Sequence, residues 1–181
     1  MYHTVVIGGG CLGAATAVSL QKKLNKLGKG EKVGLIEKAV LCAAESSRHS
    51  GIVRSANADP DASMMASIST KMWKNIRDHW GIDMELDEFG AIWIAKKNSD
   101  GDNPAWTDLS KRMEKINLVF EEIDPDSAIQ KCGTTLITDK DESYFYEPAA
   151  FQLDPSILRS TLYEAIEENG VELFEKTEVE T

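Results

Sequence analysis

The sequence has few cysteines, no long apolar run and a shortage of basic residues. Its three cysteines, Cys11, Cys42 and Cys132, are widely spaced among 181 residues and form no CxxC pair. Such usage argues against a disulfide scaffold and a zinc site, so we expect no bound metal and a reducing, cytoplasmic location. The opening residues, MYHTVVIGGG, lack the basic and apolar regions of a signal peptide. Every apolar run is shorter than the roughly 20 residues that cross a bilayer, which predicts no membrane span.

The charge balance argues against a nucleic-acid-binding or membrane-binding function. The chain carries 30 acidic and 20 basic residues, which gives a formal net charge of -10. A nucleic acid or an anionic membrane would be repelled by this excess, so we expect neither as a partner. A content of 42% hydrophobic and 28% charged residues is typical of a soluble globular protein. An anionic ligand must therefore be held by local features of the fold.

The N-terminal segment has the pattern of a strand, a helix and a second strand. Residues 4–7 form a short, unbroken apolar run, as in a strand buried within a parallel sheet. Residues 11–27 place apolar side chains near one helical face, and Gly28 follows as a helix-ending residue. Residues 32–37 have the composition of a second strand. The three segments together predict one βαβ crossover.

A glycine-rich turn joins the first strand to the helix. Gly8, Gly10 and Gly13 match the pattern GxGxxG. The first glycine permits a tight turn, the second lets a diphosphate approach the backbone, and the third lets the helix pack closely on the sheet. The N–H groups and the positive dipole end of the helix then suit a bound phosphate. The motif therefore predicts dinucleotide binding.

Glu37 strengthens this prediction. It ends the second predicted strand, 24 residues after Gly13, where a carboxylate can accept hydrogen bonds from both hydroxyls of a ribose. A carboxylate there also disfavours a 2′-phosphate, which argues against NADP. The alternative is a glycine-rich structural turn followed by a solvated glutamate.

The rest of the chain predicts further helices and strands. A long helix is expected over residues 60–80, where apolar side chains recur every four residues and are expected in the core. The residues of this stripe are Met64, Ile68, Met72, Ile76 and Trp80, and Met65 and Trp73 widen it. Residues 84–95 predict a pair of strands, the second over 91–94. Asp or Asn precedes Pro60, Pro104, Pro125 and Pro155, which predicts an N-cap and the first residue of a helix at each place.

Four segments carry a resemblance to a known family. They are VVIGGGCLGAATAVSL at the start, LIEK at 35–38, SSRHSGIVRS at 46–55, and YEPAAFQLDPSIL at 146–158 followed by a helix and GVEL. Together they resemble the FAD-dependent amine and amino-acid oxidoreductases, which include enzymes that oxidise D-amino acids, sarcosine and dimethylglycine. The resemblance spans nearly the whole chain and implies FAD as the cofactor. Members of that family are roughly twice as long, and their second half supplies much of the substrate pocket.

The resemblance also implies a set of cofactor-binding residues, within the glycine loop, at the end of the second strand and in the loop that follows it. They are Gly8, Gly10, Cys11, Leu12, Gly13, Glu37, Lys38, Ser46, Ser47, Arg48, His49, Ser50 and Gly51. Hydroxyl and guanidinium groups in residues 46–50 suit phosphate recognition, and a polar surface loop is the alternative. His49 stands near the place where some relatives attach FAD covalently, although a noncovalent contact or simple packing fits its spacing better.

Arg54 stands where some sarcosine-oxidising relatives place an arginine that holds the substrate carboxylate. A guanidinium suits a carboxylate because two parallel hydrogen bonds can form. A surface salt bridge is the alternative role.

These observations predict an α/β protein with a Rossmann-like, parallel FAD-binding sheet and part of an inserted antiparallel substrate domain, a fold incomplete relative to the family. Residues 1–80 and 150–181 are expected in the FAD-binding domain and residues 81–149 in the substrate domain. The predicted function is that of the N-terminal half, or one subunit, of an FAD-dependent oxidoreductase acting on an amine or amino acid. A companion chain is expected to supply the other half. Oxidation of a 2-hydroxy acid, or a non-catalytic dinucleotide-binding module, are the alternatives.

Overall fold

The computed structural model describes residues 2–57, 59–133 and 136–180, which form two compact units. The first unit contains the chain up to Gly51, the segment Asn75–Glu85 and the chain from Leu153 onward. The second unit contains Ile52–Lys74 and Leu86–Gln152. These units are defined by their internal contacts, and the division into an FAD-binding and a substrate domain remains a prediction about roles.

The first unit is built on a parallel sheet. Its elements are β1 (Tyr2–Ile7), α1 (Cys11–Lys26), β2 (Lys32–Ile36), the 3-10 helix η1 (Glu45–Ser47), α3 (Ile76–Trp80), α6 (Pro155–Asn169) and β8 (Glu172–Phe174). The strand order is β1-β2-β8, and both strand pairs are parallel. The βαβ crossover predicted for the N-terminal segment is therefore confirmed.

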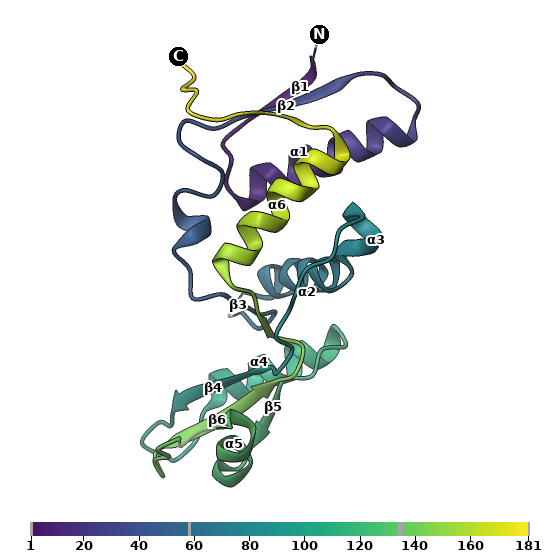
Figure 1. Cartoon of the computed structure of the whole chain (residues 1–181). Helices are drawn as coiled ribbons and strands as arrows, with labels where there is room; N and C mark the ends of the chain where they lie inside the picture. The colour runs from purple at the N-terminus through teal and green to yellow at the C-terminus, as the bar shows by residue number, and fades with distance from the viewer. Residues whose placement is uncertain (1, 58, 134–135, 181) are drawn as a thin grey trace. The chain divides into compact units, whose positions relative to one another are not determined.

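Two helices cover one face of this sheet. α1 and α6 lie side by side (Figure 1), with α1 on β1 and β2 and α6 on β8. Val33 and Leu35 of β2 face these helices and are completely buried. Alanines at positions 14 and 17 of α1 are also fully buried, and their small side chains allow the helix to approach the strands closely.

The opposite face of the parallel sheet is apolar and open. Because side chains alternate along a strand, Val5 and Ile7 point away from the face that α1 covers. Val5 is 45% exposed, Ile7 is 67% exposed, and Tyr2 and Phe174 are each 39% exposed. The rings of Tyr2 and Phe174 meet edge to face, with centroids 5.9 Å apart. We call these four residues the open sheet face.

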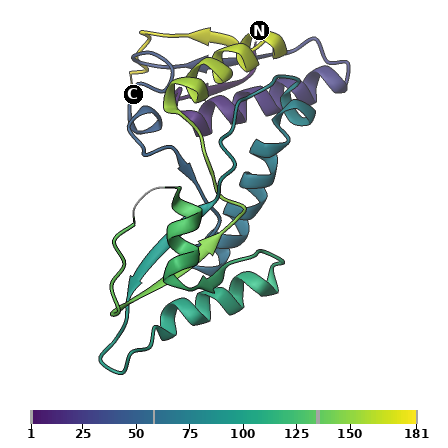
Figure 2. The same cartoon turned by 60° about the horizontal axis from the view of Figure 1, so that its bottom comes forward.

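The second unit contains an antiparallel sheet and a short ribbon. Its elements are β3 (Ile52–Val53), α2 (Pro60–Lys74), β4 (Ala91–Lys96), α4 (Pro104–Lys115), β5 (Glu121–Ile123), α5 (Pro125–Cys132), β6 (Glu142–Glu147) and β7 (Phe151–Gln152). The sheet has the order β4-β6-β5, and β3 pairs with β7. Figure 2 shows α4 and the strands of this sheet from a second direction. The predicted fold class, a parallel sheet together with antiparallel strands, is confirmed.

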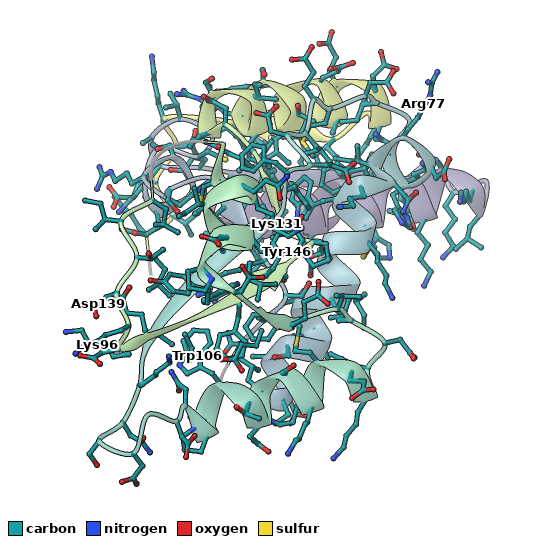
Figure 3. All side chains as sticks on the ribbon, turned by 90° about the horizontal axis from the view of Figure 1, so that it is seen from below. Arg77, Lys96, Trp106, Lys131, Asp139 and Tyr146 are labelled. Atoms are coloured by element: carbon teal, nitrogen blue, oxygen red, sulfur yellow. The ribbon has the colours of Figure 1, made fainter. Side chains whose placement is uncertain are left out.

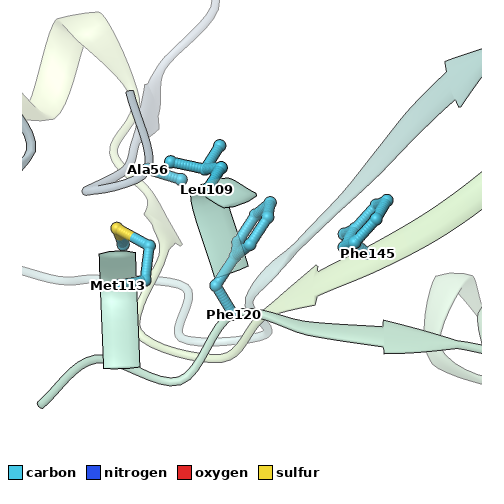
Figure 4. Packing of buried hydrophobic residues seen from close by; sticks show 5 residues of the cluster. All are labelled: Ala56, Leu109, Met113, Phe120 and Phe145. Carbon is cyan, nitrogen blue, oxygen red and sulfur yellow. The ribbon is translucent and has the colours of Figure 1, made fainter. Parts of the chain in front are cut away.

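Aromatic side chains fill the core of the second unit. Phe120 and Phe145 stack with centroids 5.4 Å apart, beside Leu109, Met113 and Ala56 (Figure 4). Elsewhere on β6 the Lys131 ammonium of α5 lies 4.0 Å from the centroid of the Tyr146 ring (Figure 3). The sheet therefore has its own packed core within this unit.

The expected helix over residues 60–80 is wrong in two respects. It is interrupted at Asn75, so that α2 ends at Lys74 and α3 begins at Ile76. Its apolar stripe also does not form core along α2. The exposed members are Met64 (50%), Ile68 (55%) and Met72 (42%), whereas Ile76 and Trp80 of α3 are buried.

The buried face of α2 carries small hydroxyl residues instead. Ser63, Ser67 and Thr70 are buried, and their hydroxyls are satisfied locally. Ser63 Oγ donates to the Asn57 carbonyl at 3.0 Å, and the hydroxyls of Ser55 and Thr70 are 3.2 Å apart. Short hydroxyl side chains with partners inside the protein can be buried at low cost. Hydropathy alone therefore predicts the wrong face of α2 as the buried one.

The strand pair expected over residues 84–95 is found only in part, whereas helices begin at all four expected prolines. The first strand of the expected pair over residues 84–95 is absent from the described residues, where Asp87 forms only an isolated bridge to Gln152. The four helix starts are confirmed, since α2, α4, α5 and α6 each begin at the predicted proline. The expected side-chain cap is wrong for Asn103, whose amide instead donates to the Lys96 carbonyl at 2.9 Å. Asp124 and Asp154 accept hydrogen bonds from Ser127 N and Ser156 N, as N-caps do.

Candidate nucleotide-binding site

The glycine loop between β1 and α1 is a tight backbone turn. Gly8 has φ +105°, a conformation that L side chains rarely adopt, and its N–H donates to the Ile36 carbonyl at 2.8 Å. A Cβ at Gly13 would lie 2.0 Å from the Gly8 carbonyl oxygen. The third glycine is therefore required by the turn itself as well as by the packing of α1 on the sheet.

The N-terminus of α1 presents backbone donors toward the loop that follows β2. Its N-cap, Gly10, provides no side-chain cap, and no acidic residue lies in the first turn. Instead, the first N–H of the helix, that of Cys11, donates to Ser46 Oγ at 3.0 Å. Leu12 beside it is 79% exposed. The remaining donors and the helix dipole make this end of α1 suitable for a phosphate.

Glu37 lies directly beside the glycine loop. Its Oε2 accepts from Gly9 N at 2.7 Å and its Oε1 accepts from Ala39 N at 2.8 Å. These two backbone donors, Ala39 first, hold the pKa of the Glu37 carboxyl below its ordinary value. Each oxygen keeps a further acceptor position, so the carboxylate can still receive two hydroxyl donors.

The loop after Glu37 returns to the glycine loop. Cys42 N donates to the Gly9 carbonyl at 2.8 Å, and Cys42 adopts a left-handed φ of +57°. Burial, with a smaller contribution from Cys11, raises the pKa of the Cys42 thiol to about 11. Lys38 is exposed at the start of this loop. The segment thus forms a rim on one side of the glycine loop.

Residues 46–51 have different positions within the first unit. Of these residues, which the structure describes in full, Ser46 accepts a hydrogen bond from Cys11 N at the start of α1. A Cβ at Gly10 would also lie 3.2 Å from Ser46 Oγ. Arg48, His49 and Ser50 are exposed, and the His49 Nδ1 accepts locally from Gly51 N at 2.9 Å. Ser47 lies in η1, and its hydroxyl donates to the Ala44 carbonyl at 3.1 Å. The cofactor contacts proposed for this loop remain predictions.

Arg54 belongs to the second unit. Its guanidinium lies 4.4 Å from the centroid of the Trp93 ring, and its Nη1 donates to the Ala56 carbonyl at 2.8 Å. Arg54 and Trp93 line a cavity of about 370 Å³ together with Asn57, Trp106 and Arg112, among others. A planar cation above an indole ring remains accessible to an anion from its other side.

The prediction of site residues missed Glu147, which holds the backbone beside Arg54. This carboxylate is completely buried, accepts from Ser55 N and Ala56 N, and receives the Trp93 Nε1 at 3.1 Å. Three donors converging on one carboxylate from two distant segments fix the backbone that carries Arg54. The pairing of β6 with β4 brings Trp93 to Glu147, and Ser55 and Ala56 lie about 90 residues earlier in the chain, so no local pattern could have predicted these contacts.

No group of three or more His, Cys, Asp or Glu side chains could hold a metal ion in residues 2–57, 59–133 and 136–180. Within the same ranges, no helix has the length and apolarity needed to cross a membrane.

A parallel βαβ unit whose glycine loop, helix N-terminus and strand-end carboxylate converge defines an α/β dinucleotide-binding fold. The chain belongs to the family of FAD dependent oxidoreductases (DAO), whose model matches residues 3–181. This confirms the family expected from the sequence, together with the cofactor that its description names.

Solved structures with the same fold include several enzymes of amino-acid metabolism. The L-proline dehydrogenase from P. horikoshii is 20% identical with a TM-score of 0.80, over 99% of this chain and 45% of its own. The glycine oxidase from Geobacillus kaustophilus is 21% identical with a TM-score of 0.76, over 98% of this chain and 47% of its own. The L-amino acid deaminase from Proteus vulgaris is 19% identical with a TM-score of 0.79, over 97% of this chain and 40% of its own.

The chain therefore spans less than half the length of these structural neighbours. No significant match was found among curated proteins.

Proposed function

We propose that this chain provides the adenosine- and diphosphate-binding part of an FAD-dependent oxidoreductase that oxidises an amino acid or a related amine. Membership of the FAD dependent family supports the cofactor, and neighbours named for proline, glycine and L-amino acids support the substrate class. Bound FAD would supply a hydride acceptor, so that the substrate becomes an imine, which water then hydrolyses.

The observation that carries this proposal is the contact between Glu37 and the glycine loop. The carboxylate lies against Gly9, and the open N-terminus of α1 begins two residues later. A ribose bound by Glu37 would therefore place its attached diphosphate near the N–H groups of α1. The protein's net negative charge is offset there by backbone dipoles, which need no basic side chain.

Further residues of the first unit are proposed to extend this site. Ser46, Ser47, Arg48, Ser50 and the Gly51 backbone offer hydroxyl, guanidinium and amide groups to the diphosphate and the flavin. His49 is proposed as a noncovalent contact, because its ring nitrogen already receives Gly51 N.

Arg54 is proposed to bind the substrate carboxylate. Its guanidinium lines a cavity with indole walls, a setting that suits a carboxylate joined to an apolar body. Amino acids and 2-hydroxy acids share this carboxylate, so the enzyme's preference between them must depend on the group at the neighbouring carbon. The neighbours named for proline and glycine favour the amino acid. A sarcosine-type secondary amine is proposed as one form of this substrate on the basis of the sequence resemblance alone.

The remaining half of the fold is proposed to cover the open sheet face and to complete the substrate pocket. Parallel sheets are normally covered on both faces, whereas Val5, Ile7 and Phe174 are exposed here. The structural neighbours contain more than half of their length beyond the matched region, which is enough chain for this purpose. A companion polypeptide could supply that half, and a cytoplasmic location would suit the three free cysteines, Cys11, Cys42 and Cys132.

Titration of the purified chain with FAD and with ADP tests the proposal. We expect both to bind, with ADP displacing FAD and FMN failing to do so, because the adenosine and diphosphate carry the recognition. Gly10→Val should abolish binding, because its side chain would occupy the space through which the diphosphate approaches the backbone. The chain should stay folded, since the added Cβ would approach only the rotatable Ser46 hydroxyl. Gly30→Val is the matched control, because no atom lies within 4 Å of a Cβ there. If the wild-type chain bound neither FAD nor ADP, the proposal would be refuted.

A further inference from the structure

We propose that Glu175 and Tyr163 are positioning residues, which hold the loop after β2 in the shape that presents Glu37 to the adenosine ribose. This inference rests on the proposed function and assigns a role to two side chains that lie outside the nucleotide motif. Neither residue belongs to the glycine loop or to β2, which Glu37 directly follows.

A hydrogen bond joins Glu175 to the loop after β2 at Leu41. Glu175 follows β8, and its Oε1 accepts from Leu41 N at 2.7 Å across a separation of 134 residues. Leu41 is completely buried, so its N–H requires a partner within the protein. Removal of the carboxylate would leave this donor unsatisfied and release the middle of the loop.

Backbone hydrogen bonds join the segment after β8 to the start of the same loop. Glu37 N donates to the Phe174 carbonyl at 2.8 Å, and Thr177 N donates to the Glu37 carbonyl at 3.0 Å. Lys176 N donates to the Ala39 carbonyl at 2.8 Å. The segment after β8 thus accompanies the loop from Glu37 to Ala39, and the Glu175 side chain extends the same attachment to Leu41.

The loop that Glu175 holds is itself bonded to Glu37 and to the glycine loop. Ala39 N donates to Glu37 Oε1, and Cys42 N donates to the Gly9 carbonyl. Leu41 lies between these two points, so the Glu175 contact holds the loop between the ribose carboxylate and the glycine loop. A shift at Leu41 would therefore change the orientation of Glu37 without touching the N-terminus of α1.

Tyr163 orients the Glu175 carboxylate. The hydroxyl of Tyr163, on α6, donates to the same Oε1 that receives Leu41 N. Burial and this bond to Glu175 raise the pKa of the Tyr163 hydroxyl, so it stays protonated as a donor. Its side chain is half-buried, so removing the hydroxyl alone leaves the ring packed in place.

The experiment compares ligands that report on different parts of the site. ADP, 2′-deoxy-ADP and inorganic pyrophosphate are titrated into the wild-type chain and into Glu175→Ala, Glu175→Gln and Tyr163→Phe. We expect Glu175→Ala to weaken ADP binding about tenfold, as for loss of a charge-assisted hydrogen bond. Pyrophosphate affinity should stay unchanged, and the preference for ADP over 2′-deoxy-ADP should shrink. Tyr163→Phe should have a smaller effect in the same direction.

Conservative and neutral variants separate positioning from damage to the fold. Glu175→Gln keeps an acceptor for Leu41 N and should restore most of the ribose preference. Glu178→Ala, an exposed acid nearby, should leave all three affinities unchanged. Amide hydrogen exchange at Leu41 should accelerate in Glu175→Ala.

Two results would overturn the inference. One is an unchanged ribose preference in Glu175→Ala, and the other is an equal loss of pyrophosphate and ADP binding. A wild-type chain that binds no nucleotide would refute the proposed function, and this inference with it.

Discussion

Glu37 and Gly9 are joined by a hydrogen bond of 2.7 Å from the Gly9 N–H to the Glu37 carboxylate. The residue that is expected to bind the ribose and the loop that is expected to bind the diphosphate are thus attached to one another within the protein. A Cβ at Gly9 would lie 2.8 Å from the Cβ of Glu37. The close approach depends on the glycine that the GxGxxG pattern leaves unspecified.

Gly9→Ala is therefore expected to push Glu37 away from the glycine loop. ADP affinity should fall about tenfold, since one charge-assisted contact to the ribose is misplaced. The preference for ADP over 2′-deoxy-ADP should fall with it, as measured by calorimetric titration. Gly30→Ala serves as the control. Retention of the full ribose preference in Gly9→Ala would contradict the role given to this contact.

The depressed pKa of Glu37 predicts a pH dependence of stability. Because the folded pKa lies below the ordinary value of 4.5, ionised Glu37 stabilises the folded chain. This contribution is complete above the ordinary value and is lost as the pH falls through the folded pKa. Urea unfolding should show a constant difference between wild type and Glu37→Gln at neutral pH, and a narrowing difference below 4.5. A difference that widens on acidification would contradict this assignment.

The open sheet face predicts that similar substitutions on the two faces of the parallel sheet change the free energy of unfolding by very different amounts. Ile7→Thr is expected to change the free energy of unfolding by less than about 0.5 kcal/mol, because the side chain is exposed. Leu35→Thr should cost about 2–4 kcal/mol, because it is completely buried under α1. Chemical denaturation measures both. Binding of a hydrophobic dye should fall in Ile7→Thr, and an equal loss of stability in the two variants would show that the face is covered.

The three thiols should react at different rates. Cys132 is exposed and should react first with a thiol reagent, whereas Cys42 is buried with a pKa of about 11. Only about one Cys42 thiol in a thousand is ionised at about pH 8, which should delay its reaction until the chain unfolds. Cys11 begins α1, so saturating ADP should slow its modification. Mass spectrometry of time points tests the order, and fast labelling of Cys42 would contradict it.

Local physical rules predicted much of the local structure of the candidate nucleotide-binding site. The turn at Gly8, the helix after it and the acid at the end of β2 each depend on short segments, and each lies where the pattern placed it. The helix starts at Pro125 and Pro155 were also local, since an aspartate caps each one. Such features need only the residue's own conformational preferences and its close neighbours in the chain.

The errors concern long-range packing. The stripe of Met64, Ile68 and Met72 was expected in the core, but hydropathy cannot tell which face of a helix finds a partner within the chain. Ser63 and Thr70 fill that place through hydrogen bonds invisible to a hydrophobic pattern. The contact between Glu175 and Leu41 was inaccessible for a similar reason, because it depends on the addition of β8 to the sheet.

The bond from Cys11 N to Ser46 Oγ has a consequence for the energetics of recognition. A phosphate oxygen that takes this N–H displaces a protein hydroxyl, so the number of hydrogen bonds at that atom does not change. Affinity gained at α1 must then come from the charge of the ligand and from neighbouring amides. The displaced Ser46 hydroxyl becomes free to rotate and can then donate its own proton to a phosphate oxygen. Cofactor binding would thus exchange one hydrogen bond within the protein for two hydrogen bonds to the ligand, one from each of the atoms that the internal bond had joined.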